Sequence, residues 1–170
     1  MAEIILITGG SRSGKSAFAE RTAEALPGPR AYVATCPVID PETEERIRKH
    51  REARRGRGWQ TIEETVDLAG VIRRAGACRV LLVDCLTLWL SNVLLAQRDD
   101  EIEKLLLLLP TLPGLLLFVS NEVGGGIVPD NALARRFRDE QGRLNQRVAA
   151  VSQQVTLVVA GLPLVLKSSK

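Results

Sequence analysis

The sequence predicts an α/β protein built on a mainly parallel β-sheet with helices on both faces. Short apolar runs, such as residues 79–84 and 115–120, alternate with longer stretches whose apolar residues recur at helical spacing. The runs are apolar throughout their middles, which is typical of strands buried on both faces. Ligands of such sheets bind at the carboxyl ends of the strands. The polar residues expected at these ends are Thr8, Thr35, Asp84, Asn121 and Glu122.

The first half of the chain is expected to hold three strands and three helices. Helix-forming residues fill positions 16–26 before Pro27-Gly28-Pro29 ends that helix. Asp40 is expected to cap the second helix and Pro41 to occupy its first position. The predicted strands are residues 3–8, 30–35 and 59–63, the last at an edge, and the predicted helices are 16–26, 41–55 and 66–75.

The second half continues the alternation. Asp130 or Asn131 is expected to cap the longest helix, whose apolar face Gln141 and Gly142 interrupt. Gly124-Gly125-Gly126 forms a loop before it. The predicted strands are 79–84, 115–120 and 155–159, with a small edge pairing at 164–166, and the predicted helices are 86–97, 101–109 and 132–153.

The composition predicts one cytoplasmic domain over residues 1–170. Of the residues, 45% are apolar, enough for a sizeable core, and the net charge of +3 is too small to indicate nucleic-acid binding. Cys36, Cys78 and Cys85 include no Cys-x-x-Cys pair, and an odd number argues against a disulfide framework. No signal-like segment opens the chain, and the longest leucine-rich stretch is too interrupted for a membrane span.

The first strand leads into a glycine-rich motif, residues 9–16, that fits the pattern Gly-x-x-x-x-Gly-Lys-Ser. Gly9 and Gly14 would let backbone N–H groups turn inward around phosphate oxygens. Lys15 would reach the β- and γ-phosphates, and the Ser16 hydroxyl would bind Mg²⁺. A glycine-rich turn with a chance Lys-Ser is the alternative. The strand before the motif and the helix after it favour a P-loop NTPase that binds a nucleoside triphosphate.

Two acidic residues follow buried strands. Asp84 closes an apolar strand at the position of a Walker B acid, where it would hold the magnesium ion, although a plain turn residue is the alternative. Glu122 follows the next buried strand. It could orient a substrate hydroxyl or the water of the metal, or it could be a loop acid without a role.

The predicted helix at 41–55 has an unusual composition. From residue 42 to 55 its only sizeable apolar residue is Ile47, and seven cations lie between residues 46 and 57. His50, the only histidine of the sequence, shares one side of this helix with Ile47 and Arg54. A solvated charged face is the ordinary explanation. A nucleophilic or phosphate-binding histidine is the alternative, and composition leaves both open.

Several motifs occur in an order that resembles one known family, the bifunctional adenosylcobinamide kinase / adenosylcobinamide-phosphate guanylyltransferases of cobalamin biosynthesis. The resemblance covers nearly the whole chain. Its motifs are the phosphate loop at 9–16, His50 in its arginine-rich helix, Trp59-Gln-Thr61-Ile-Glu63, and the segments 84–92, 120–129, 135–147 and 160–163.

The resemblance implies two reactions. ATP or GTP phosphorylates the aminopropanol hydroxyl of adenosylcobinamide, and His50 then attacks the α-phosphate of GTP, with Mg²⁺ bound by Ser16 and Asp84. The resulting histidine-bound GMP passes to adenosylcobinamide-phosphate, giving adenosylcobinamide-GDP. It also implies a RecA-like sheet and a homotrimer.

The resemblance further implies a set of nucleotide contacts that extends beyond the phosphate loop. They are Gly9, Gly10, Ser11, Arg12, Ser13, Gly14, Lys15, Ser16, Ala34, Thr35, Cys36, Arg51, Glu52, Ala53, Arg54, Glu63 and Asp84. Two other hypotheses stay open at this point. One is a single-function small-molecule P-loop kinase whose histidine helix is only a lid, and the other is a regulatory nucleotide-binding protein whose basic helix grips an acidic partner or RNA.

Overall fold

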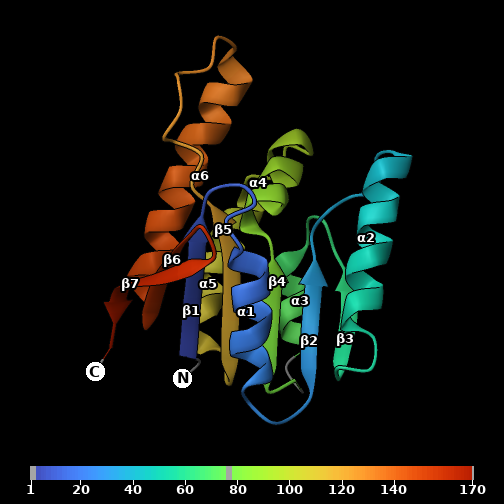
Figure 1. Ribbon diagram of the computed structural model, residues 1–170. Helices are drawn as coiled ribbons and strands as arrows, with labels where there is room; N and C mark the ends of the chain where they lie inside the picture. The colour runs from blue at the N-terminus through green and yellow to red at the C-terminus, as the bar shows by residue number, and fades with distance from the viewer. Residues whose placement is uncertain (1–2, 76–77, 170) are drawn as a thin grey trace.

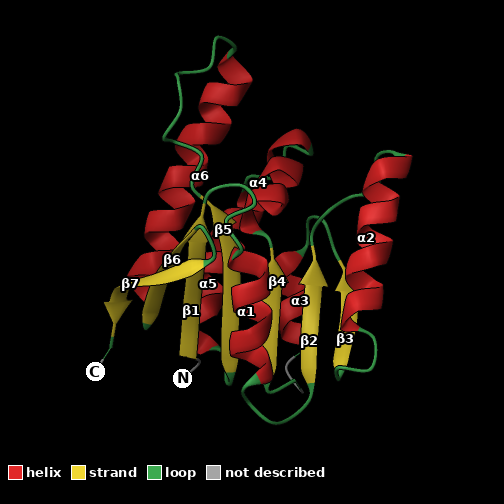
Figure 2. Ribbon diagram, in the orientation of Figure 1, coloured by secondary structure: helices red, strands yellow, loops and turns green. Residues whose placement is uncertain are grey.

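A computed structural model describes residues 3–75 and 78–169, and its centre is one seven-stranded sheet (Figures 1 and 2). The strand order is β3-β2-β4-β5-β1-β6-β7. All neighbouring pairs are parallel except β6 with β7. The strands are β1 (Glu3–Gly9), β2 (Arg30–Ala34), β3 (Trp59–Glu63), β4 (Val80–Asp84), β5 (Leu115–Asn121), β6 (Gln154–Val159) and β7 (Leu162–Ser168).

The register of the sheet brings the predicted polar strand ends to one edge. Gly9 of β1 is level with Asn121 of β5. Ala34 of β2 is level with Asp84 of β4. Because the strands are parallel, their carboxyl ends share this edge, which is where ligands of such sheets bind. The prediction of a mainly parallel sheet is confirmed.

Helices cover both faces, as predicted. Helix α1 packs against one face, where Ala19 and Ala23 are buried with side chains from β1, β4 and β5. Helices α3 to α6 supply the larger core on the other face, where Trp89 and Phe118 are fully buried. Figure 2 shows α1 in front of the sheet with α3 and α5 behind it. Apart from α2, the helices are α1 (Lys15–Glu24), α3 (Leu68–Arg74), α4 (Leu86–Leu95), α5 (Asp100–Leu108), the 3-10 turn η1 (Leu109–Thr111) and α6 (Ala132–Val151).

Helix α2 (Pro41–Arg54) differs from the others because it buries only one residue, Arg54. It lies beside β3 at the edge of the sheet (Figure 1). Asp40 caps its start by accepting a 2.7 Å hydrogen bond from the Thr43 N–H. Arg48 forms surface ion pairs one turn away, with Glu45 and Glu52. Capping and local charge pairs therefore hold this helix, as its lack of an apolar face predicts.

The structure departs from the sequence predictions at two places. The pairing expected at 164–166 is a full antiparallel strand, β7, because positive φ angles at Ala160 and Gly161 make a tight turn after β6. Gln141, expected to interrupt the apolar face of α6, is fully buried and bonded within the protein instead. None of the described helices has both the length and the apolarity needed to cross a bilayer.

Candidate functional site

The glycine-rich loop is shaped by two glycines that could not be replaced without strain. A Cβ atom on Gly9 would lie 2.4 Å from the carbonyl oxygen of Val158, so the close approach of β6 requires a glycine there. Gly14 has a φ of 93°, in the region that L side chains rarely adopt, and it precedes the first turn of α1. The loop therefore presents its backbone and the N-terminus of α1 to the same space, which suits an anion.

Lys15 folds back across this loop. Its Nζ donates a 2.8 Å hydrogen bond to the carbonyl of Gly10. Burial lowers the pKa of Lys15, and the nearby Cys85 and Asp84 partly oppose that shift. A desolvated ammonium group gains more from a bound anion than an exposed one does, because little water competes for it. Lys15 is thus prepared to bind a phosphate group.

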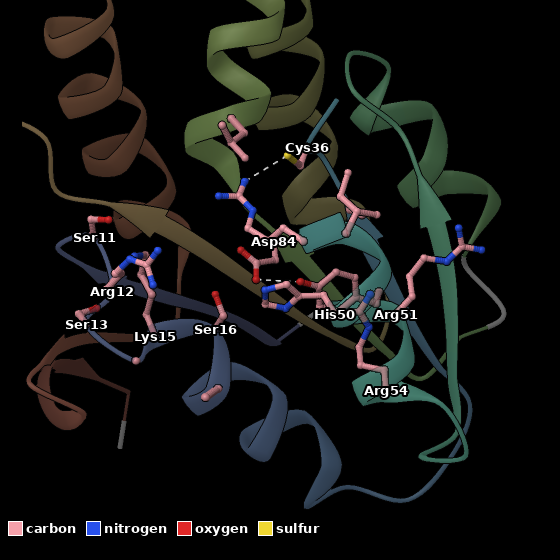
Figure 3. Close-up of a pocket in the computed structure, with 17 residues that line it drawn as sticks. Ser11, Arg12, Ser13, Lys15, Ser16, Cys36, His50, Arg51, Arg54 and Asp84 are labelled. Carbon is pink, nitrogen blue, oxygen red and sulfur yellow. Dashed lines mark hydrogen bonds between the residues drawn. The ribbon is translucent and has the colours of Figure 1, made fainter. Parts of the chain in front are cut away.

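A cavity of about 530 Å³ lies between this loop and helix α2 (Figure 3). Its size falls in the range of small-molecule sites. Most of the residues that line it are polar or charged, together with a few apolar ones. It is lined by Ser11, Arg12, Ser13, Gly14, Lys15, Ser16, Ala17, Tyr32, Ala34, Cys36, Arg46, Ile47, His50, Arg51, Arg54, Asp84 and Leu88.

Three side chains stack across the floor of the cavity. The Tyr32 hydroxyl donates a 2.8 Å hydrogen bond to Asp84 Oδ2. The guanidinium carbon of Arg54 lies 3.5 Å from the centre of the Tyr32 ring. Burial raises the pKa of Tyr32, so this phenol remains a hydrogen-bond donor. The stack links the end of β4, through β2, to the end of α2.

Arg54 is the least satisfied charged group of this stack. Only 3% of it is exposed. Its Nε and Nη1 atoms have no hydrogen-bond partner among the residues that the structure describes. The nearest carboxylate oxygen, on Glu20, is 3.9 Å from Nη1. A buried guanidinium whose N–H donors lack partners lowers the stability of the fold unless an anion accepts hydrogen bonds from it. This again favours a phosphate-bearing ligand.

His50 comes from α2, and its imidazole is directed into the cavity (Figure 3). Ile47 and Arg54 line the cavity beside it, so the shared side predicted for these three residues is the one that faces the phosphate loop. The side chain of His50 is exposed to solvent. An accessible imidazole in the same cavity as two cationic groups, Lys15 and Arg54, can act as a nucleophile toward phosphorus.

Most of the predicted nucleotide contacts line the cavity, but several do not. Thr35 is fully buried and exchanges hydrogen bonds with the backbone of Cys85. Glu63 pairs with Arg51 at 3.1 Å at the edge of the sheet. Glu52 pairs with Arg48, and it lines a second cleft of about 440 Å³ beside Trp59. The remaining predicted contacts outside the cavity lining are Gly9, Gly10 and Ala53.

The structure adds lining residues that the sequence prediction missed. Tyr32 is the most informative, because it holds both Asp84 and Arg54. Arg46 reaches the cavity wall, where its Nη2 lies 3.5 Å from Cys36 Sγ. The alternation of strand β2 marks Tyr32 only as a buried position, and no local motif identifies it. Ala17, Ile47 and Leu88 complete the additional set.

Ser16 and Asp84 both line the cavity, and their oxygen atoms are the ligand type that Mg²⁺ prefers. Within the described residues there is no cluster of three or more His, Cys, Asp or Glu side chains that could cage a metal ion. Mg²⁺ rarely uses such a cage and instead combines one or two protein oxygens with substrate phosphates and water. The donor set therefore fits a nucleotide-bound magnesium ion.

Comparison with known proteins gives consistent results. A family model described as cobinamide kinase / cobinamide phosphate guanyltransferase matches residues 5–166. The bifunctional adenosylcobalamin biosynthesis protein CobP of Pseudomonas aeruginosa is 51% identical over 95% of this chain and 96% of its own length. The corresponding CobU protein of Salmonella typhimurium is 40% identical over 96% of this chain and 99% of its own length.

Among solved structures, the flagellar accessory protein FlaH of Methanocaldococcus jannaschii is similar, with a TM-score of 0.57 and 13% identity over 98% of this chain and 78% of that one. Identity this low shows the fold alone. Together with the loop geometry and the strand order, it confirms the predicted P-loop NTPase fold with a RecA-like parallel sheet.

Proposed function

Because this chain belongs to the cobinamide kinase / cobinamide phosphate guanyltransferase family, it is a bifunctional enzyme, and we propose that one cavity anchors the nucleotide for both reactions. The enzyme phosphorylates adenosylcobinamide and transfers GMP from GTP to adenosylcobinamide-phosphate, giving adenosylcobinamide-GDP and pyrophosphate. Membership of this family sets aside both the single-function kinase and the regulatory binding protein as hypotheses.

His50 is proposed as the nucleophile of the guanylyl transfer. The observation that supports this role is that the only histidine of the sequence lines the same cavity as Lys15 and Arg54. An imidazole nitrogen forms the N–P bond to the α-phosphate of GTP as the bond to the β-phosphate breaks, and pyrophosphate leaves with the electron pair. A phosphate oxygen of adenosylcobinamide-phosphate then attacks the same phosphorus and releases the imidazole.

The remaining groups of the cavity have proposed supporting roles. Lys15 and the loop N–H groups hold the phosphate chain, and Arg54 balances the charge that builds up on the α-phosphate. Ser16 and Asp84 would hold Mg²⁺, which neutralises negative charge on the phosphates when it is bound. Tyr32 fixes the rotamers of Asp84 and Arg54 from beneath. ATP and GTP are both proposed as phosphoryl donors.

A covalent-trapping experiment tests the nucleophile. Incubation with GTP labelled at the α-phosphate should leave acid-labile label on the wild-type protein and none on His50→Ala. Lys49→Ala is the matched control, because Lys49 is the exposed neighbour and, within residues 3–75 and 78–169, pairs only with Glu45, at 3.5 Å. Undiminished labelling of His50→Ala would assign the nucleophile elsewhere.

A homotrimeric, cytoplasmic enzyme in which residues 1–170 form one domain is also proposed. The single continuous sheet supports one domain. Leu162, Leu164 and Leu166 of β7 are each more than half exposed, which supports a contact between subunits on that side. Light scattering coupled to size exclusion should give three times the mass of the chain, and a monomeric mass would contradict the trimer.

A further inference from the structure

Glu122 lies just beyond the carboxyl end of the sheet, and no part of the proposed chemistry uses it. It directly follows β5, and β5 lies between the phosphate-loop strand β1 and the Asp84 strand β4. Its N–H donates a 3.1 Å hydrogen bond to the carbonyl of Gly9, the first residue of the loop. The backbone of Glu122 is therefore fixed to the phosphate loop itself.

The side chain of Glu122 is held by one of its two carboxylate oxygens. Oε1 accepts a 2.8 Å hydrogen bond from the Thr8 hydroxyl and a 3.1 Å bond from Asn145 Nδ2. Thr8 comes from β1 and Asn145 from α6, so two separate elements fix the carboxylate. Within the described part of the chain no group donates to Oε2, and the residue as a whole is exposed. One oxygen is thus anchored and the other remains available to a molecule arriving from solvent.

A buried polar cluster holds Asn145, and Asn145 in turn holds the Glu122 carboxylate. Ser120 Oγ and Gln141 Nε2 both donate to Asn145 Oδ1, at 2.6 and 2.9 Å. This orients the amide so that its nitrogen faces Glu122. Ser120 and Gln141 are fully buried, and Gln141 Oε1 has no partner among the described residues. Apolar side chains would join α6 to β5 without that cost. Asn145 Nδ2 also donates a 3.1 Å hydrogen bond to the carbonyl of Asn121, so the cluster fixes the end of β5 together with the Glu122 carboxylate.

Glu122 and His50 lie on opposite sides of the Asp84 strand. His50 belongs to α2, beside β3 and β2, whereas Glu122 lies between β4 and β1. Both flank the same phosphate loop. One triphosphate held by that loop can therefore meet the imidazole from one side and a second substrate from the other.

We propose that Glu122 is a catalytic residue of the kinase reaction and accepts the proton of the aminopropanol hydroxyl of adenosylcobinamide. This assignment rests on the proposed function. The hydroxyl oxygen forms a bond to the γ-phosphorus as the bond from γ-phosphorus to the bridging oxygen breaks. The nucleoside diphosphate leaves with the electron pair, and the hydroxyl proton moves to Glu122 Oε2. Thr8 and Asn145 are positioning residues that hold the carboxylate for this transfer.

The test is Glu122→Gln, which keeps the shape of the side chain but cannot accept the proton. Phosphorylated corrinoid is measured by mass spectrometry with adenosylcobinamide and ATP, and covalent GMP labelling is measured in parallel. We expect kcat of the kinase to fall by about 10²–10⁴-fold, with KM for ATP and the GMP labelling within about twofold of wild type. His50→Ala should lose the GMP labelling, which distinguishes the role of His50 from that of Glu122.

Two further variants sharpen the result. Asp130→Asn removes an exposed acid from the same loop and should leave both activities unchanged. Asn145→Leu should lower kcat of the kinase, and adding it to Glu122→Gln should cost nothing more, because Asn145 acts through Glu122.

Three outcomes would overturn the assignment. They are kinase turnover of Glu122→Gln within threefold of wild type, equal losses of kinase activity and GMP labelling, and recovery of Glu122→Gln at high Mg²⁺, which would mean that Glu122 serves the metal's water. A wild-type enzyme that forms no covalent GMP would instead refute the role of His50 and leave the kinase test intact.

Discussion

Replacing Arg54 with methionine should preserve the stability of the fold but slow the covalent GMP labelling. Arg54 is 3% exposed, and its Nε and Nη1 have no hydrogen-bond partner among the described residues. Each such buried donor costs about 1–3 kcal/mol. The opposing terms are a cation–π contact with Tyr32, worth about 2 kcal/mol when buried, and an ion pair with Glu20 at 3.9 Å that is too long to contribute much.

Methionine keeps an unbranched apolar stem against the Tyr32 ring, and Glu20 keeps its 3.3 Å pair with Arg57. The substitution therefore does not leave the Glu20 carboxylate without a cationic partner. The free energy of unfolding should therefore stay level or rise by about 1–2 kcal/mol, which shifts Tm upward by about 2–4 °C per kcal/mol for a domain of this size. Covalent GMP labelling should fall by about 10²–10³-fold, because the charge facing the α-phosphate is gone.

Urea unfolding and thermal melts measure the stability, and the labelling assay measures the chemistry. Arg55→Met is the matched control, since Arg55 directly follows Arg54 at the end of α2 but is exposed and lies outside the main cavity. A loss of more than about 2 kcal/mol in Arg54→Met would show that the arginine is a structural residue. Labelling at the wild-type rate would show that it makes no contact with the reacting phosphate.

Two other predictions concern the cysteines and helix α2. Iodoacetamide at pH 8 should alkylate Cys36 and Cys78 before Cys85, because Cys85 is buried and burial raises the pKa of its thiol to about 11. GTP should protect only Cys36 from alkylation, since of the three cysteines it alone lines the cavity. Peptide mass spectrometry would contradict these expectations if it found Cys85 modified first or Cys36 unprotected by GTP. Acid should loosen α2 before the core, because hydrogen bonds from Thr43 lower the pKa of Asp40 and the Arg48 side chain lowers that of Glu45 to about 2. Groups with lowered pKa values stabilise the helix above their ordinary pKa of about 4, and this contribution is lost as the pH falls through the lowered values. The Cα chemical shifts of α2 should therefore move toward coil values between about pH 4 and 2, while those of β4 and β5 should not. A simultaneous change in all three elements would contradict the prediction.

Features that depend on neighbouring residues were predictable from the sequence. The phosphate loop is defined by the spacing of Gly9, Gly14 and Lys15, and the Asp40 cap by the residues just after it. The strand ends at Asp84 and Asn121 follow from apolar runs that stop abruptly. These signals are local, so no tertiary information was needed to place them.

Features that depend on distant partners were missed. Tyr32 matters because of Asp84, fifty-two residues away in the sequence. Gln141 breaks the apolar pattern of α6, and only the contacts with Ser120 and Asn145 explain why it is buried. The length of β7 depends on a turn at Ala160, whose positive φ is unusual for a residue with a side chain. Helical and strand periodicities carry no information about these pairings.

The position of α2 has a consequence for how such an enzyme can evolve. Most residues of a packed core constrain one another, so a change at one position requires compensation at others. Of the fourteen residues of α2, only Arg54 is buried. The rest of this helix can vary without disturbing the sheet, and a new reactive group can be tried there at little cost to folding. An ancestral phosphate-transferring scaffold could in this way gain a second reaction by altering one surface helix between two strands, while its original activity persisted throughout.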